Sequence, residues 1–251
     1  MIHRVLKILI WILIAAWFVV IMGFVSGEAN KVLCNRIEVI MSDTVHNRFV
    51  TRTDIRAMLE NTDMQLQGYP LAEINTRSLE RTLEQNPYVR NAEVSKDISG
   101  RLEVRVEQRV PLVRLMPEGK RGFYLDKEGM KLPLSDQFTP LILLASGNIP
   151  HPEEDSRMNK RLGEIYSFSS YLTDHPFWKE QIVQIYVDRN GEYELIPRVG
   201  AHHILLGSMV QWEKKLRNLE LLYRQGLSKY GWNTYGTINL KYTNQVICTK
   251  R

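Results

Sequence analysis

Residues of the types that most often carry chemistry are few in this chain and are scattered. The segment 151–155 combines one histidine with three acids, but it contains a proline and has no further ligand at helical or hairpin spacing, which favours a solvated loop. His202 and His203 are adjacent and would point to opposite faces of a strand, which argues against a chelating pair. The serine–glycine pairs indicate turns, and the sequence has no P-loop, nucleophile elbow or dinucleotide fingerprint. We therefore predict a non-catalytic protein without metal or cofactor.

Composition and charge exclude further classes. The chain has 251 residues and a net charge of +5, with acids and bases interspersed rather than gathered, so we expect no nucleic-acid partner. Its two cysteines, Cys34 and Cys248, lie near opposite ends and lack metal-ligand spacing. A disulfide between them would need an oxidising compartment, and two free thiols are the favoured interpretation.

The N-terminal region contains eighteen consecutive residues without a charge, 8–25. As a helix they would span roughly 27 Å, close to the hydrocarbon thickness of a bilayer. Arg4 and Lys7 precede the run and Glu28 follows it, so the positive-inside rule leaves residues 1–7 in the cytoplasm and exports the rest. A cleaved signal peptide is the alternative, but this run is longer than usual and no good cleavage site follows it. We predict an uncleaved, integral membrane anchor and a linker over 26–35.

The next stretch predicts the order β-α-α-β-β. A short strand over 37–41 precedes a helix capped by Thr51 or Thr53, and Asn75 is the cap candidate for a second helix. Two strands follow, joined by a turn at 99–100. In the second of them apolar residues alternate with charged ones from Arg101 to Arg109. One sheet face would be covered by the two helices and the other would be open to water.

The second half predicts a larger mixed sheet with helices. Hairpins are expected around 126–129 and around the Asn190-Gly191 turn, with further short strands over 140–147 and 202–207. Helices are expected over 158–172 and after Gly207. In the latter helix apolar residues recur from Val210 to Tyr223, and Lys215 is assigned to the wet face. Two final strands would turn around Asn244.

Two phrases make the chain resemble a known family. "NPYVRNAEV" followed by "GRLEVRVEQRVPL" resembles the POTRA domain of the FtsQ (DivIB) cell-division family, through Pro87, Tyr88, Val89, Ala92, Val94, Gly100, Leu102, Val104, Val106 and Pro111. "INLKY" resembles that family's Ile-Asp-Leu-Arg-Tyr, from which Asn239 and Lys241 depart, so any salt bridge that the family makes there is in question. The resemblance implies an α+β fold: a single transmembrane helix, a POTRA domain over 36–112 and a mixed β-domain with flanking helices over 113–251.

The resemblance also implies a function. The resemblance implies a single-pass scaffold of the division machinery in the cytoplasmic (inner) membrane at the septum, with the C-terminus outside the cytoplasm. The implied partners are FtsB/DivIC-like and FtsL-like proteins and other divisome components, bound by strand addition at the end of the chain. The expected contact residues are Tyr242, Asn244, Gln245, Val246, Ile247, Thr249 and Lys250.

Competing interpretations stay open for both the residues and the function. Tyr242 could be an ordinary core aromatic, and the last strand could simply close the sheet. The chain could instead be a POTRA-containing adaptor for secretion or outer-membrane protein biogenesis, or a cell-wall enzyme with an unrecognised site.

Overall fold

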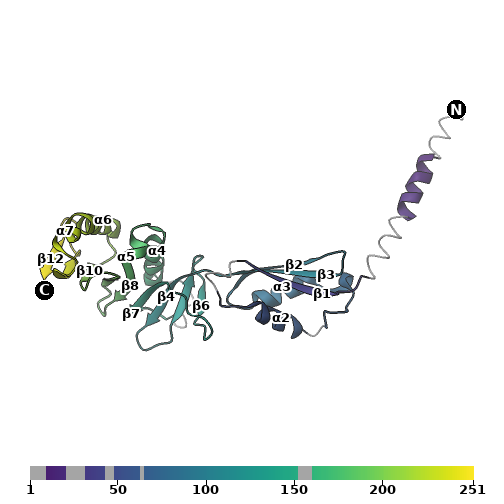
Figure 1. The fold of residues 1–251 in the computed structure, drawn as a ribbon, viewed down its shortest axis with the longest axis horizontal. Helices are drawn as coiled ribbons and strands as arrows, with labels where there is room; N and C mark the ends of the chain where they lie inside the picture. Colours follow the sequence, from purple (N-terminus) through teal and green to yellow (C-terminus); the bar gives the residue numbers. More distant parts are fainter. Residues whose placement is uncertain (1–9, 21–31, 43–47, 63–64, 152–159) are drawn as a thin grey trace. The chain divides into compact units, whose positions relative to one another are not determined.

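The computed structural model describes residues 10–20, 32–42, 48–62, 65–151 and 160–251. Residues 10–20 are helical. Among the described residues no helix is both long enough and apolar enough to cross a membrane. The expected tail 1–7 lies outside the described residues, and the expected anchor and linker lie only partly within them. The chain divides into two compact units, 1–108 and 109–251 (Figure 1).

The first unit has the β-α-α-β-β order, with one additional short turn of helix. Its elements are β1 (Arg36–Ser42), α2 (Arg52–Glu60), the 3₁₀ turn η1 (Leu71–Glu73), α3 (Thr76–Glu84), β2 (Val89–Lys96) and β3 (Arg101–Gln108). The strand order is β1-β3-β2, with β1 parallel and β2 antiparallel to β3. The central strand is therefore the alternating segment that the sequence predicts to be half-buried.

Local chemistry sets the ends of both helices. Thr51 caps α2: its side chain accepts from the backbone N–H of Asp54, whose carboxylate accepts in turn from the N–H of Thr51 at 2.8 Å. Asn75 caps α3 through the N–H of Ser78. The apolar side of each helix is buried, as are the core-facing residues of β3: Ile55, Leu59, Leu79, Leu83, Leu102, Val104 and Val106.

The boundary between the units falls between Gln108 and Arg109. Gln108 is buried in the first unit, where its side-chain oxygen accepts from the N–H of Val50 at 3.1 Å. Arg109 instead donates at 3.0 Å to Asp126, a fully buried carboxylate of the second unit. The structure thus places Pro111 in a strand of the second unit, whereas the sequence analysis groups it with the first.

The second unit is built on a nine-stranded mixed sheet in the order β12-β11-β10-β9-β8-β7-β4-β5-β6. Its strands are β4 (Pro111–Pro117), β5 (Phe123–Asp126), β6 (Lys131–Pro133), β7 (Leu143–Gly147), β8 (Ile182–Val187), β9 (Tyr193–Pro197), β10 (His203–Gly207), β11 (Tyr235–Asn239) and β12 (Ile247–Lys250). Its helices are α4 (Lys160–Asp174), α5 (Trp178–Gln181), α6 (Trp212–Leu222), a π-helical turn η2 (Tyr223–Leu227) and α7 (Ser228–Tyr230). Both predicted hairpins, β5–β6 and β8–β9, are present.

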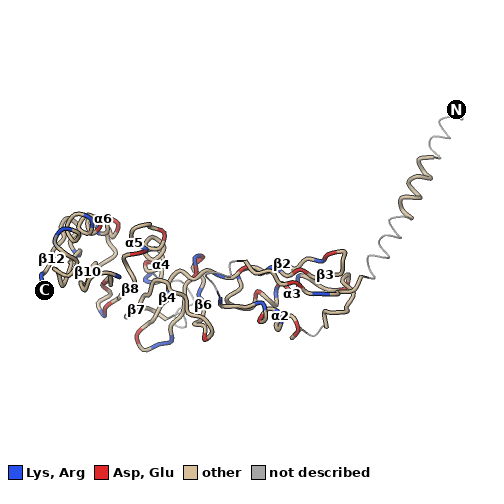
Figure 2. The backbone as a smooth tube through the Cα atoms, in the orientation of Figure 1, with Lys and Arg blue, Asp and Glu red and all other residues tan. Residues whose placement is uncertain are grey.

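One core joins the sheet to its helices. It combines inward residues of the strands with the buried sides of α4 and α6, including Leu115, Ile185, Leu195, Ile204, Ile165, Phe168, Leu216 and Leu219. Acidic and basic residues are interspersed along both units, as Figure 2 shows.

Two assignments for the helix after Gly207 are wrong. Val210 precedes α6 and is exposed, whereas Lys215 is buried with its ammonium inside the fold. Helical spacing explains the burial, because Lys215 lies three residues after Trp212 and four before Leu219, on the apolar stripe.

Candidate partner-binding edge

The last strand, β12, lies at one edge of the nine-stranded sheet and pairs only with β11. The pairing is antiparallel and runs from Asn239 opposite Ile247 to Tyr235 opposite Lys250. A strand with one neighbour leaves a row of backbone donors and acceptors on its other side. The sequence places this strand correctly, although it begins at Ile247 rather than at Gln245.

The direction of the free groups follows from one hydrogen bond. The N–H of Arg251 donates to the carbonyl of Thr234 at 3.3 Å, so it points toward the β11 side. In an antiparallel ladder these directions alternate along the strand. The backbone groups of Thr249 and Ile247 therefore face β11, and those of Cys248 and Lys250 face outward. The bulge in this pairing lies in β11, between Tyr235 and Thr237, so β12 keeps its regular alternation.

The expected contact residues do not all lie on one surface. Tyr242 is 59 % exposed, so it is not a core aromatic residue. Ile247 is 41 % exposed. Thr249 and Lys250 are also exposed. Val246 is only partly buried and packs against the core. The edge thus combines free backbone groups with one exposed apolar anchor, Ile247.

The turn before β12 is held by helix α6. Asn244 accepts from the Lys214 ammonium at 2.8 Å, and the Asn218 side chain donates to the carbonyl of Thr243 at 3.0 Å. The N–H of Gln245 closes the turn on the carbonyl of Tyr242 at 3.4 Å. Sequence reasoning misses Lys214 and Asn218 as positioning residues, although their spacing of four puts them on one helix face.

Buried polar groups hold the neighbouring strand β10. The Lys215 ammonium donates to the carbonyls of Leu206 at 2.9 Å and Ser208 at 2.8 Å. Burial lowers the pKa of this lysine, an effect that the charge of Glu192 partly offsets. These two bonds tie the end of β10 to α6.

His202 forms the second polar anchor of this region. Its Nε2 lies 2.9 Å from the hydroxyl of Tyr223, in a buried contact. Burial lowers the pKa of His202 and raises the pKa of Tyr223. His203, next in sequence, is exposed and contacts Glu194, so the two histidines diverge as the sequence analysis expects.

Lys241, where the chain departs from the family wording, has an acidic partner. Its ammonium contacts Glu192, and this hydrogen bond raises the pKa of the lysine. A salt bridge thus exists at this position.

In the first unit the sheet has β1 and β2 at its edges, and the β2 edge is partly covered. The N–H of Val94 in β2 donates to the Glu80 carboxylate at 2.9 Å, and that of Ala92 donates to Glu84 at 3.4 Å. Both acids belong to α3, so the helix covers these two outward donors of the strand. At the far edge of the larger sheet, β6 has only three residues and ends in Pro133. Of these three edges, β12 alone combines open backbone donors with an exposed apolar side chain.

The signature residues of the first unit are structural. Val89, Ala92, Val94, Leu102, Val104 and Val106 are all buried. Tyr88, which follows Pro87, stacks on Phe49 with ring centroids 4.8 Å apart. Gly100 has φ +88°, and a Cβ there would come within 2.7 Å of the carbonyl of Leu33.

Few groups in the described part of the chain suggest metal or redox chemistry. Those residues contain no cluster of three or more His, Cys, Asp or Glu that could hold a metal ion. His151 packs edge-on against Phe123, and the rest of its segment, 152–155, lies outside the described residues. Cys34 and Cys248 are free thiols whose pKa values are raised by burial.

Comparisons with known proteins match both units. A family model described as FtsQ/DivIB, C-terminal related, matches residues 110–249, and a POTRA-like domain model matches residues 32–107. The limits of the two matches flank the structural boundary at 108/109. A cell division protein FtsQ from Rhodothermus marinus is 25% identical over 189 residues, which cover 72% of this chain and 67% of that protein.

Proposed function

We propose that this chain, which belongs to the FtsQ/DivIB family, is a non-catalytic scaffold of the cell-division machinery and binds its partners at β12. The observation that carries the proposal is the open edge of β12, with the outward backbone groups of Cys248 and Lys250 beside the exposed Ile247. A partner strand can complete those hydrogen bonds and cover the isoleucine.

The partners are FtsB/DivIC-like and FtsL-like proteins, through which the scaffold links early and late division proteins to septal cell-wall synthesis. Two features support strand addition over a loose surface contact. The turn before β12 is fixed to α6 through Lys214 and Asn218, so little entropy remains to be lost when the edge is occupied. Tyr242 stands exposed in the same turn and adds an aromatic contact.

The proposed location is the cytoplasmic membrane at the division septum. The uncharged run 8–25, preceded by two bases, supports a single-pass anchor with the N-terminus inside. The described residues from 32 onward would then lie outside the cytoplasm.

The β2 edge of the first unit gives no support to an adaptor function in secretion or outer-membrane biogenesis. Such an adaptor would bind extended clients by pairing with an exposed strand. Here Glu80 and Glu84 already accept the bonds that the β2 edge would offer to a client.

The test combines co-purification with a matched substitution. Ile247→Asp places a charge in the edge that the partner would cover, so we expect about a tenfold loss of FtsB-like protein co-purified with the full chain, equivalent to ~1.4 kcal/mol. Ile98→Asp is the control, because Ile98 is 94% exposed and lies in the first unit. Equal recovery with both variants would refute the edge assignment.

Depletion in cells tests the broader function. A division scaffold predicts long unseparated filaments, whereas an adaptor predicts loss of outer-membrane proteins with normal septation.

A further inference from the structure

A second apolar surface lies in the second unit, at the end of the sheet remote from the β8–β9 turn. Here the parallel strands β4, β7 and β8 begin, β9 ends, and α4 and α5 stand alongside. The space between them is a cavity of about 360 Å³. That volume lies within the range of roughly 300–1,000 Å³ typical of ligand pockets.

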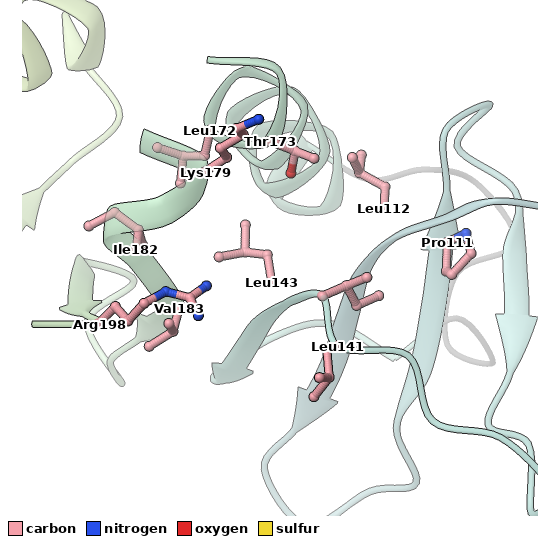
Figure 3. Close-up of a pocket in the computed structure, with 11 residues that line it drawn as sticks. Pro111, Leu112, Leu141, Leu143, Leu172, Thr173, Lys179, Ile182, Val183 and Arg198 are labelled. Atoms are coloured by element: carbon pink, nitrogen blue, oxygen red, sulfur yellow. The ribbon is translucent and has the colours of Figure 1, made fainter. Parts of the chain in front are cut away.

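The walls of the cavity are mainly aliphatic. Leu112, Leu172 and Ile182 are buried in its base, and Leu143 and Val183 are half-buried beside it. Figure 3 shows Leu143 between the α4–α5 side and the β4 side. At the mouth Leu141 is fully exposed, and Val199, just after the lining residue Arg198, is 47 % exposed. Apolar surface that continues beyond a cavity in this way is typical of interaction sites.

The charged lining is basic only. Lys179 and Arg198 stand at the cavity, and none of its described lining residues is acidic. Arg198 is also positioned: its N–H donates to the carbonyl of Gln181 at 2.7 Å, and its Nε donates to the carbonyl of Glu180 at 3.0 Å. Neither bond uses the two terminal nitrogens of the guanidinium. These nitrogens can donate to both oxygens of a carboxylate in a bidentate pair.

We propose that this cavity, lined by the aliphatic side chains and by Lys179 and Arg198, is a second docking site, for an extended acidic and apolar segment of a partner protein. One large apolar side chain of the segment enters between Leu143 and Leu172. A neighbouring Asp or Glu pairs with Arg198. The site is separate from β12 and does not depend on the proposed strand addition.

Charge and shape favour a polypeptide segment over a membrane surface as the occupant. A bilayer surface is smooth on the scale of a side chain and cannot fill a recess of this volume, whereas a polypeptide can insert one side chain. The exposed apolar side chains of Leu141, which lines the cavity, and Val199, next to the lining residue Arg198, fit a chain that runs across it.

The test uses two labelled twelve-residue peptides with the full-length protein. Both alternate Leu and Phe with charged residues; one carries Asp and Glu and the other Lys and Arg. Fluorescence anisotropy should show at least tenfold tighter binding of the acidic peptide. Methyl resonances of Leu143 and Leu172 should shift on its addition.

A charge swap separates recognition from damage. Arg198→Glu should reverse the preference, so that the basic peptide now binds more tightly. Arg189→Glu is the control, because Arg189 is an exposed arginine of the same unit outside the cavity lining. It should leave the preference unchanged.

Three results would overturn the proposal. The first is no saturable binding of the acidic peptide at concentrations up to about 1 mM. The second is equal loss with both arginine variants. The third is Arg198-dependent binding to vesicles of anionic phosphatidylglycerol without peptide binding, which would assign the surface to a membrane.

Discussion

Replacement of Lys215 by methionine tests how the structure supports the edge at β12. Methionine keeps an unbranched apolar stem of similar length and removes only the ammonium. That ammonium donates to the carbonyls of Leu206 and Ser208 at the end of β10. Because β10 pairs with β11, and β11 pairs with β12, the loss affects the strands that present the edge.

The magnitude follows from what each carbonyl loses. The bond to Leu206 is buried, and a buried carbonyl without a donor costs ~1–3 kcal/mol. Ser208 is exposed, so water can replace its bond at little cost. Removal of a desolvated charge partly offsets the loss, since burial of the ammonium is itself unfavourable. We expect a net loss of about 2 kcal/mol, or about thirtyfold in the folding equilibrium.

Urea unfolding followed by tryptophan fluorescence measures this loss. Of the five tryptophans, Trp178, Trp212 and Trp232 lie in the second unit, and the other two lie in the uncharged run 8–25, so the change in signal reports mainly the second unit. Lys214→Met is the matched control: it makes the same substitution one residue earlier, where the ammonium bonds Asn244 at an exposed site. We expect less than about 0.5 kcal/mol from the control.

The dependence on pH gives a second readout. The pKa of Lys215 is lowered in the folded state by burial, so above that pKa the unfolded chain holds the proton that the folded chain has lost. The stability contribution of this lysine therefore rises with pH between its folded pKa and the unfolded value near 10.5. Lys215→Met should lack that rise. Equal stabilities for the two methionine variants, with identical pH profiles, would refute the assigned role of the buried ammonium.

Three further predictions concern the strand edges and the buried histidine. Cys248→Pro removes an outward N–H and should weaken partner binding about tenfold while the unfolding transition stays unchanged. Thr249→Pro breaks the pairing with β11 and should lower the free energy of unfolding by ~3 kcal/mol. Equal destabilisation by the two variants would contradict the assigned directions of the N–H groups. Burial lowers the pKa of His202, so its contribution to stability should be lost as pH falls below about 6.5 toward the folded pKa, and His202→Gln should remove this loss in acid denaturation curves. Alanine at both Glu80 and Glu84 should speed hydrogen exchange of the β2 amides at least tenfold. Glutamine at both positions should preserve the protection, because its side-chain oxygen still accepts a hydrogen bond. Equal exchange rates in the alanine and glutamine variants would contradict the covering role of the two acids.

Much of the fold follows from local signals in the sequence. Thr51 and Asn75 cap their helices as expected, and the alternation that begins at Arg101 correctly predicts a half-buried strand. The Asn190-Gly191 turn correctly predicts a hairpin. Each of these signals is contained within about ten residues, so it can be interpreted without knowledge of the tertiary structure.

Features that depend on distant partners could not be predicted in the same way. Lys215 is classed as a surface residue by its type. Its helical spacing puts it on the apolar stripe, and the carbonyls of Leu206 and Ser208, which no local pattern places beside it, accept from its ammonium. The unit boundary at 108/109 likewise depends on which unit the side chains of Gln108 and Arg109 enter. That β12 has one neighbour is a property of sheet order, which no local pattern contains.

The contrast between β2 and β12 shows how a neighbouring helix can cover the backbone groups of an edge strand or leave them open. Outward N–H groups of a strand recur every second residue, about 6.6 Å apart, and side chains four apart on a helix are spaced by about 6 Å. Glu80 and Glu84 on α3 match that repeat and accept from Val94 and Ala92. Near β12 the corresponding pair on α6, Lys214 and Asn218, instead bonds the preceding turn and leaves the strand uncovered. Two helices with the same spacing of polar residues therefore have opposite effects, one covering backbone groups of an edge strand and the other leaving them open.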